Sequence, residues 1–117
     1  MLYFGCDHPD VDFLYHEELQ SWERAGIVSI RASFCRAPIN GQTYVQDRIW
    51  DERQEICDMI TSGAHIYVCG DGRSMAPSVR ETFVRIYQER HSCSDEQSNE
   101  WLNDMRRSFR YMVDVFG

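Results

Sequence analysis

The sequence predicts an α/β fold: a parallel β-sheet in a three-layer arrangement, with helices on both faces of the sheet. Short apolar segments rich in β-branched and aromatic residues alternate with amphipathic segments at helical spacing along the 117 residues. Few residues separate one element from the next, and helical crossovers are what parallel strands require. With 43% apolar and 13% aromatic residues, the chain can bury a core and is not expected to be disordered.

Four segments have the composition of strands, and four have the spacing of helices. The strands are expected at residues 2–6, 27–34, 65–69 and 111–115. Two helices are expected at residues 11–24 and 44–62. A third is expected to begin after Ser74 as its N-cap, with Pro77 in its first turn. A fourth is expected from Ser94 to about residue 107, because Ser94 and Gln97 have the spacing of a capping box. Ligands bind beyond the carboxyl ends of such parallel strands, so a site is expected in the loops that follow them.

The charged residues and cysteines exclude several kinds of chemistry. All 12 basic residues are arginine, and with 19 acidic residues the formal charge is −7. Without lysine there can be no lysine Schiff base and no Walker A lysine, and an acidic chain without a basic stripe is not expected to bind nucleic acid. The five cysteines form no C-x-x-C pair, so we expect neither a disulfide framework nor a metal site.

The hydropathy pattern gives no sign of a membrane segment. No apolar run approaches the roughly 18 residues that a spanning helix needs. The opening residues also lack the basic and long apolar segments of a secretory signal. We therefore expect a reduced, cytoplasmic protein.

The loops after strands carry the residues best able to bind a ligand. The segment 69–74 has two glycines and joins a strand to a helix start, where backbone amides can face a phosphate; without the third glycine of a dinucleotide fingerprint, a tight structural turn is the alternative. Arg36, accompanied by Tyr44 and Gln46, indicates a pocket, the alternative being a solvated surface arginine. Asp114 lies in an apolar terminal run, where a carboxylate is costly unless it has a partner or a task.

Six short strings define a stronger pattern when they are taken together. They are Leu2-Tyr3-Phe4-Gly5-Cys6, Asp12-Phe13-Leu14-Tyr15 with Glu17-Glu18-Leu19, Ser33-Phe34-Cys35-Arg36, Thr43-Tyr44-Val45-Gln46-Asp47, Tyr67-Val68-Cys69-Gly70-Asp71 with Met75-Ala76, and Arg110-Tyr111-Met112-Val113-Asp114-Val115. In order and spacing they resemble the C-terminal NADP(H)-binding region of diflavin reductases. That group includes NADPH-cytochrome P-450 reductase, relatives in nitric oxide synthase and sulfite reductase, and the self-sufficient cytochrome P-450/reductase fusions, to which the resemblance is greatest.

The resemblance implies a ferredoxin-NADP reductase-like NADP-binding module, with residues 1–117 as one NADP(H)-binding domain that lacks the family's first strand. It implies an NADPH-dependent flavoprotein oxidoreductase, in which NADPH gives a hydride to FAD and electrons pass through FMN to a haem monooxygenase. The partners would be the FAD- and FMN-binding domains and a haem domain of the same polypeptide. Without the first strand we expect two half-sheets with open edges, and we expect the isolated chain to be inactive as a reductase.

The resemblance assigns a group of residues to the adenosine end of NADPH. These cofactor-binding residues are Cys35, Arg36, Gln42, Thr43, Tyr44, Val45 and Gln46. Cys35 and Arg36 stand where relatives have a Ser-Arg pair that grips the 2′-phosphate, and Arg36 supplies a planar, two-pronged donor. Gln42 stands where a lysine is usual, which removes one positive charge from that end.

The nicotinamide end is assigned to residues near the last two strands. Cys69 and Asp114 are the catalytic candidates, because they would position the ring and support the positive charge that forms as the hydride leaves. Phe116 replaces an aromatic residue, generally tryptophan, that stacks on the flavin, and Ser78 belongs to the cofactor-binding set. Two other hypotheses stay open: a non-catalytic nucleotide-binding or interaction module of the same fold, and an unrelated α/β domain that matches by coincidence.

Overall fold

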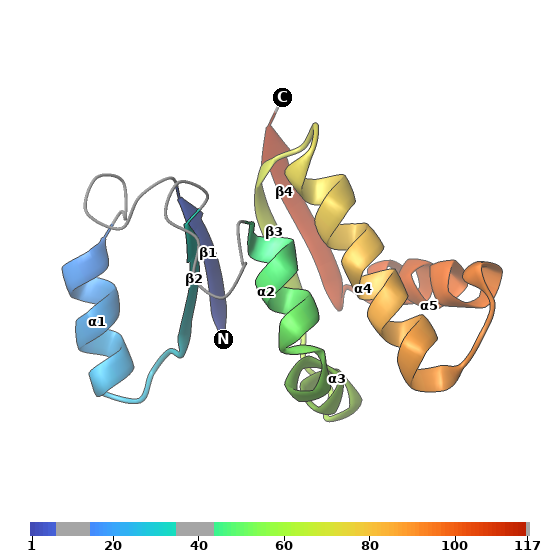
Figure 1. Ribbon diagram of the computed structural model, residues 1–117, viewed down its shortest axis with the longest axis horizontal. Helices are drawn as coiled ribbons and strands as arrows, with labels where there is room; N and C mark the ends of the chain where they lie inside the picture. The colour runs from blue at the N-terminus through green and yellow to red at the C-terminus, as the bar shows by residue number, and fades with distance from the viewer. Residues whose placement is uncertain (7–14, 35–43, 117) are drawn as a thin grey trace. The chain divides into compact units, whose positions relative to one another are not determined.

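The computed structural model describes residues 1–6, 15–34 and 44–116, and the chain divides into two compact units, Met1–Asp51 and Glu52–Gly117 (Figure 1). Unit 1 contains β1 (Leu2–Cys6), α1 (His16–Arg24), β2 (Ile30–Phe34) and α2 (Val45–Asp51). Unit 2 contains α3 (Arg53–Thr61), β3 (Ile66–Asp71), α4 (Met75–His91), α5 (Asp95–Arg107) and β4 (Tyr111–Phe116). The described residues form two parallel two-stranded sheets, β1 with β2 and β3 with β4, so the predicted α/β class and the two half-sheets are confirmed.

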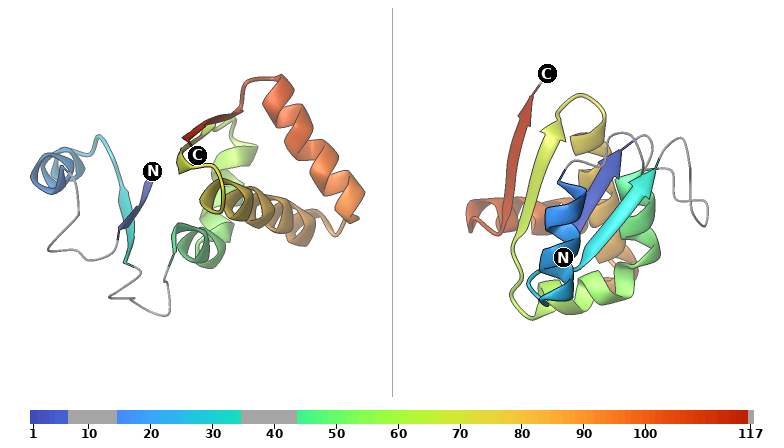
Figure 2. Two further views of the ribbon diagram at one scale, coloured as in Figure 1. Left: turned by 90° about the horizontal axis from the view of Figure 1, so that it is seen from above. Right: turned by 90° about the vertical axis from the view of Figure 1, so that its left-hand side faces the viewer.

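Unit 1 is a parallel strand pair with a helix on each face. Figure 2 shows α1 and α2 on opposite sides of the β1–β2 sheet. The parallel register pairs Leu2 with Ile30 at one end of the strands and Cys6 with Phe34 at the other. A Cβ added to Gly5 would lie 2.9 Å from Cγ2 of Val45, so only glycine lets the carboxyl end of β1 come this close to the first turn of α2. The guanidinium of Arg48 donates a 2.5 Å hydrogen bond to the carbonyl oxygen of Ala32, which ties α2 to β2 as well.

Unit 2 is organised around α4, which packs on one face of β3 and β4. Val68 and Tyr111 are buried on that face, and the Phe83 ring of α4 meets the Tyr111 ring edge-on with centroids 5.9 Å apart. The amphipathic stripe expected on α4 is confirmed, because Val79 and Phe83 are both buried. Leu102 of α5 is fully buried, so α5 completes the same core.

The capping box expected at the start of α5 is also confirmed. The Ser94 hydroxyl accepts a hydrogen bond from the Gln97 amide at 3.2 Å, and the Gln97 side chain accepts one from the Ser94 amide at 3.0 Å. Two backbone amides that the helix leaves without partners are satisfied in this way.

The single helix expected over 44–62 is wrong, because the helix breaks at Glu52. Glu52 has φ −100° and ψ 21°, outside helical geometry, and it lies in the polar run 51–55, which offers no apolar residue to continue a buried stripe. Ile49 is buried in unit 1 and Ile56 in unit 2, so the two halves of the predicted helix serve different cores.

The second strand begins at Ile30, three residues later than expected. The Ile27 amide donates to the Trp22 carbonyl at 2.9 Å, and Gly26 has φ +78°, so these residues terminate α1 rather than extend the strand. The two strands of unit 2 extend one or two residues beyond the predicted ends, to Asp71 and Phe116.

Candidate functional site

One face of the β3–β4 sheet is exposed and carries most of the residues expected at the nicotinamide end. In the parallel register Tyr67 pairs with Met112, Cys69 with Asp114 and Asp71 with Phe116, so these six side chains lie on the same face of the sheet. We call this set the open face. Tyr67 and Phe116 are both 71% exposed. On the other face Val68 and Tyr111 are less than a tenth exposed, whereas Val113 and Val115 are 45% and 40% exposed.

Cys69 and Asp114 are direct neighbours on the open face. Their Cα atoms are partners in the ladder, where neighbouring strands lie about 4.8 Å apart. The thiol is free, and within the described ranges the carboxylate of Asp114 has no hydrogen-bond or ion-pair partner. Asp114 is exposed, as are all residues of β4 after Tyr111, so its carboxylate is solvated and does not carry the cost of burial in an apolar setting.

The turn that follows β3 is held by Asp71, for which the sequence alone predicted no role. Its carboxylate accepts hydrogen bonds from the Ser74 hydroxyl at 2.6 Å, the Arg73 amide at 2.9 Å and the Ser74 amide at 3.3 Å. These bonds, the hydroxyl first, lower the pKa of Asp71 to about 2. Ser74 was expected to cap α4 with its own side chain, but its hydroxyl donates to Asp71 instead; an aspartate followed three residues later by serine at a helix start is the signal that could have revealed this.

The same turn approaches the end of β4 through Gly72. The Gly72 amide donates a 2.8 Å hydrogen bond to the carbonyl oxygen of Phe116. A Cβ on Gly72 would lie 2.9 Å from Cγ2 of Val115 and 3.1 Å from the Phe116 oxygen, so the close approach depends on the missing side chain. The expected tight structural turn is therefore confirmed, and the alternative, that its amides face a ligand, stays a prediction.

Of the other residues assigned to NADPH binding, some lie within the described ranges and some lie outside them. Cys35, Arg36, Gln42 and Thr43 lie outside the described residues. Tyr44 is 56% exposed just before α2, with its amide bonded to the Asp47 carboxylate at 2.9 Å, and Val45 and Gln46 are half-buried in the first turn of that helix. Ser78 is half-buried in the first turns of α4.

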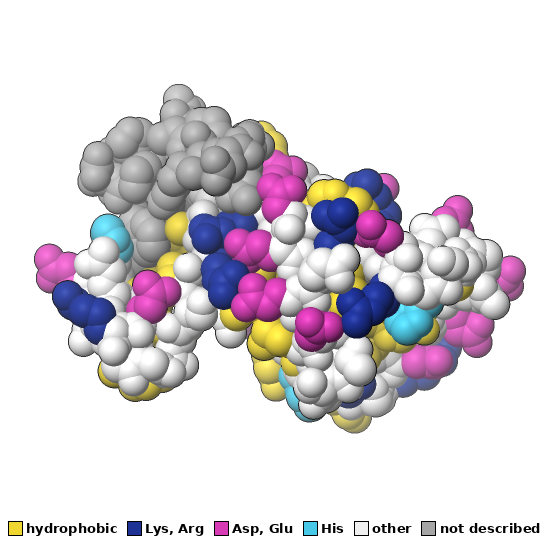
Figure 3. All heavy atoms as spheres, turned by 60° about the horizontal axis from the view of Figure 1, so that its bottom comes forward, with side chains coloured by type: hydrophobic (Ala, Val, Ile, Leu, Met, Phe, Trp, Pro, Cys, Tyr) yellow, Lys and Arg dark blue, Asp and Glu magenta, His cyan; other side chains and the backbone are white. Residues whose placement is uncertain are grey.

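Side chains of both charges share the surface that Figure 3 presents. Arginine and acidic side chains of the described residues are interspersed in this view. Within the described ranges, no group of three or more histidine, cysteine or acidic residues could hold a metal ion, and no helix is long and apolar enough to cross a bilayer.

The parallel strands and the glycine turn at a helix start are consistent with the family that comparison with known proteins shows. The chain belongs to the oxidoreductase NAD-binding domain family, whose model matches residues 1–81. It is 42% identical to the bifunctional cytochrome P450/NADPH–P450 reductase of Bacillus cereus, over 98% of this chain and 11% of that protein. It is 40% identical to NADPH oxidoreductase A of Dictyostelium discoideum, over 98% of this chain and 18% of that protein.

The human relative is similar over the same extent. The chain is 36% identical to NADPH–cytochrome P450 reductase of Homo sapiens, over 99% of this chain and 17% of that protein. The chain thus spans less than a fifth of each of these relatives. The expected family resemblance is confirmed, and the fold is consistent with a ferredoxin-NADP reductase-like NADP-binding module.

Proposed function

We propose that this chain binds NADPH and holds its nicotinamide for hydride transfer to FAD in a flavoprotein reductase. Electrons would pass from FAD through FMN to a haem monooxygenase, and the FAD-, FMN- and haem-binding domains would belong to the same polypeptide. Residues 1–117 would then be its NADP(H)-binding domain. The observation that carries this proposal is the arrangement of Cys69, Asp114 and Phe116 on one exposed face at the carboxyl ends of two parallel strands.

The open face has the features that a nicotinamide ring and a flavin would need. It is accessible, it combines aromatic and polar side chains, and no helix of the described part of unit 2 covers it. Because Gly72 has no side chain, the turn packs directly against Val115 and the Phe116 carbonyl, which fixes the end of β4 beside this face. FAD, when bound, supplies the acceptor for the hydride, and the residues of this chain position and stabilise the donor.

Asp114 acts through its charge. The dihydronicotinamide of NADPH is neutral, and the ring becomes cationic as the hydride leaves. A carboxylate without a competing partner among the described residues can stabilise that positive charge as it forms. Cys69, one strand away, presents a polarizable sulfur to the same ring and helps to hold it in place.

Phe116 controls access to the face, because it is the end residue of strand β4 and its side chain is 71% exposed. Its carbonyl is fixed by Gly72, so the ring can turn about its own side-chain bonds without displacing the strand. At the adenosine end, Arg36 would bind the 2′-phosphate, with Tyr44 and Gln46 bonding or stacking nearby.

Asp114→Asn in the full-length reductase tests the proposal. We expect the rate of FAD reduction by NADPH, measured by stopped-flow absorbance, to fall roughly tenfold while the dissociation constant of NADP⁺ changes little. Asp104→Asn is the matched control, since Asp104 is an exposed carboxylate of α5 that does not belong to the open face.

Equal rates for Asp114→Asn and the parent would contradict the role given to Asp114. If the parent itself binds NADP⁺ but does not reduce FAD, the chain is a non-catalytic nucleotide-binding module. If it does not bind NADP⁺ at all, the proposed function is wrong.

A further inference from the structure

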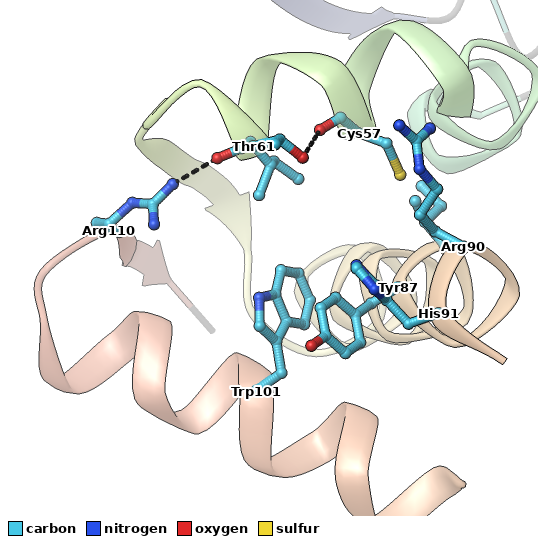
Figure 4. Close-up of a pocket in the computed structure, with 9 residues that line it drawn as sticks. Cys57, Thr61, Tyr87, Arg90, His91, Trp101 and Arg110 are labelled. Atoms are coloured by element: carbon cyan, nitrogen blue, oxygen red, sulfur yellow. Dashed lines mark hydrogen bonds between the residues drawn. The ribbon is translucent and has the colours of Figure 1, made fainter. Parts of the chain in front are cut away.

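Unit 2 contains a hollow of about 250 Å³ that the proposed function does not use (Figure 4). It lies among α3, α4, α5 and the residue that precedes β4, which places it toward the amino end of that strand and not at the open face. Its lining includes Cys57 and Thr61 of α3, Tyr87 and Arg90 of α4, Trp101 of α5, and Arg110. Its volume is just below the roughly 300 to 1,000 Å³ of pockets for drug-sized ligands, so a molecule with a single ring is the size that fits.

One side of the hollow is a stack of aromatic rings. The Tyr87 and Trp101 rings lie 4.3 Å apart at 9°, and the His91 ring lies 4.2 Å from Tyr87 at 36°. Figure 4 shows these rings opposite α3, with the hollow between them and the side chains of Cys57 and Thr61. The stack therefore offers a rigid π surface, against which another ring can pack by its edge or face.

No acidic side chain of α3 lines the hollow, and Asp58, which follows Cys57, is paired with Arg90. Burial raises the pKa of the Cys57 thiol, so this group stays neutral. The Thr61 hydroxyl donates to the Cys57 carbonyl at 2.8 Å, and none of the residues that line the hollow is acidic. A negatively charged ligand would meet no like charge in the lining.

The two arginines differ in what they can offer to a ligand. Arg90 forms an ion pair with Asp58 at 3.1 Å, so its charge is already balanced. Arg110 donates from Nη2 to the carbonyl oxygens of Ile60 and Ala64, at 2.8 and 3.1 Å, and within the described residues it pairs with no carboxylate. Carbonyl oxygens are neutral, and Nη1 has no partner in that part of the chain, so Arg110 keeps a positive charge and two N–H donors for an anion.

We propose that this hollow binds a small single-ring aromatic carboxylate, with its ring against the Tyr87–Trp101 stack and its carboxylate on Arg110. Size selects one ring, the stack selects aromatic over aliphatic, and the guanidinium selects an anion. The site is distinct from the nucleotide site and does not depend on the proposed function.

Benzoate is the probe, with benzyl alcohol and cyclohexanecarboxylate as analogues that lack the charge or the aromatic ring. Each is titrated into the isotope-labelled 117-residue chain, and amide shifts are followed by NMR. We expect saturable benzoate shifts confined to α3, α4, α5 and Arg110. The affinity for benzyl alcohol should be lower by roughly tenfold or more, and that for cyclohexanecarboxylate by roughly two- to tenfold. Equal binding of benzyl alcohol, shifts centred on the β3–β4 open face, or no saturable shift would each overturn the proposal.

Two variants test the assigned contacts. Arg110→Gln should weaken benzoate roughly tenfold to hundredfold, and its control Arg107→Gln, which removes an exposed arginine of α5, should not change the affinity. Since Arg110 also ties α3 to the start of β4, Trp101→Leu provides a second test: it should weaken benzoate roughly two- to tenfold, whereas Trp22→Leu in unit 1 should have no effect. Unchanged benzoate affinity in Trp101→Leu would overturn the proposal whether or not Arg110→Gln folds.

Discussion

Gly70 separates Cys69 from Asp71, and its backbone should make Gly70→Ala strongly destabilising. Its φ of +135° lies in a region that L-residues rarely adopt, and residues held there cost about 1 to 3 kcal/mol. The added methyl group would also lie 2.9 Å from Cε of Met75, but this atom ends a flexible side chain that can move. Strain should therefore dominate, and the free energy of unfolding should fall by about 1 to 3 kcal/mol.

Thermal unfolding of the full chain followed by circular dichroism measures this loss. For a chain of 117 residues each kcal/mol corresponds to about 4 °C in Tm. The Met75→Ala background separates the two causes, since a loss from strain persists there and a loss from contact disappears. Gly63→Ala is the reference for strain alone, because Gly63 has φ +96° and no atom within 4 Å of its added Cβ. A loss below about 0.5 kcal/mol, or one abolished by Met75→Ala, would refute the reasoning.

Three further predictions concern charge and access at the two proposed ends of NADPH. The pKa of Asp71 is about 2 in the folded chain against an ordinary 3.8, so its contribution to stability is fully present above pH 3.8 and is lost as the pH falls toward 2. Asp71→Asn should therefore flatten the dependence of the unfolding free energy on pH between these values. Equal pH profiles for the variant and the parent would contradict the role given to the Ser74 hydrogen bonds. Arg36→Ala in the full-length reductase should weaken NADPH roughly tenfold to hundredfold and barely affect NADH, as binding titrations with both would show, whereas equal losses would mean that Arg36 does not read the 2′-phosphate. Phe116→Trp should sharpen the preference for NADPH in steady-state kinetics, because a larger ring must be displaced before nicotinamide can stack; unaltered NADH turnover would place the gate elsewhere.

The element types were predictable where an apolar pattern and a stop signal coincide. Ser94 and Gln97 define the start of α5 locally, and both hydrogen bonds of the capping box are present. The break at Glu52 was not predictable in the same way, since local spacing continues across it and the break depends on two separate cores that receive Ile49 and Ile56. Tertiary burial overrides propensity there.

The candidate site was predictable in part. Cys69 and Asp114 were chosen from a family resemblance, and only the strand register shows that they are neighbours. The role of Asp71 was missed because its three hydrogen bonds depend on turn geometry and not on residue type alone. The hollow near Arg110 was missed for a similar reason, since residues from three helices and a turn meet there over a span of more than fifty positions.

The division of the core has a consequence for local opening. Within the described residues, Leu19 and Ile49 are the buried apolar side chains of unit 1, whereas unit 2 has nine, among them Val79 and Leu102. Regions with few buried apolar contacts open at lower free energy, so amide protons of β1 and β2 should exchange with solvent faster than those of β3. A nucleotide that binds near Tyr44 would stabilise the folded form of unit 1 by mass action, and the amide protons of β1 and β2 would then exchange more slowly. Hydrogen exchange in these strands would therefore measure nucleotide binding near Tyr44 even when no hydride is transferred.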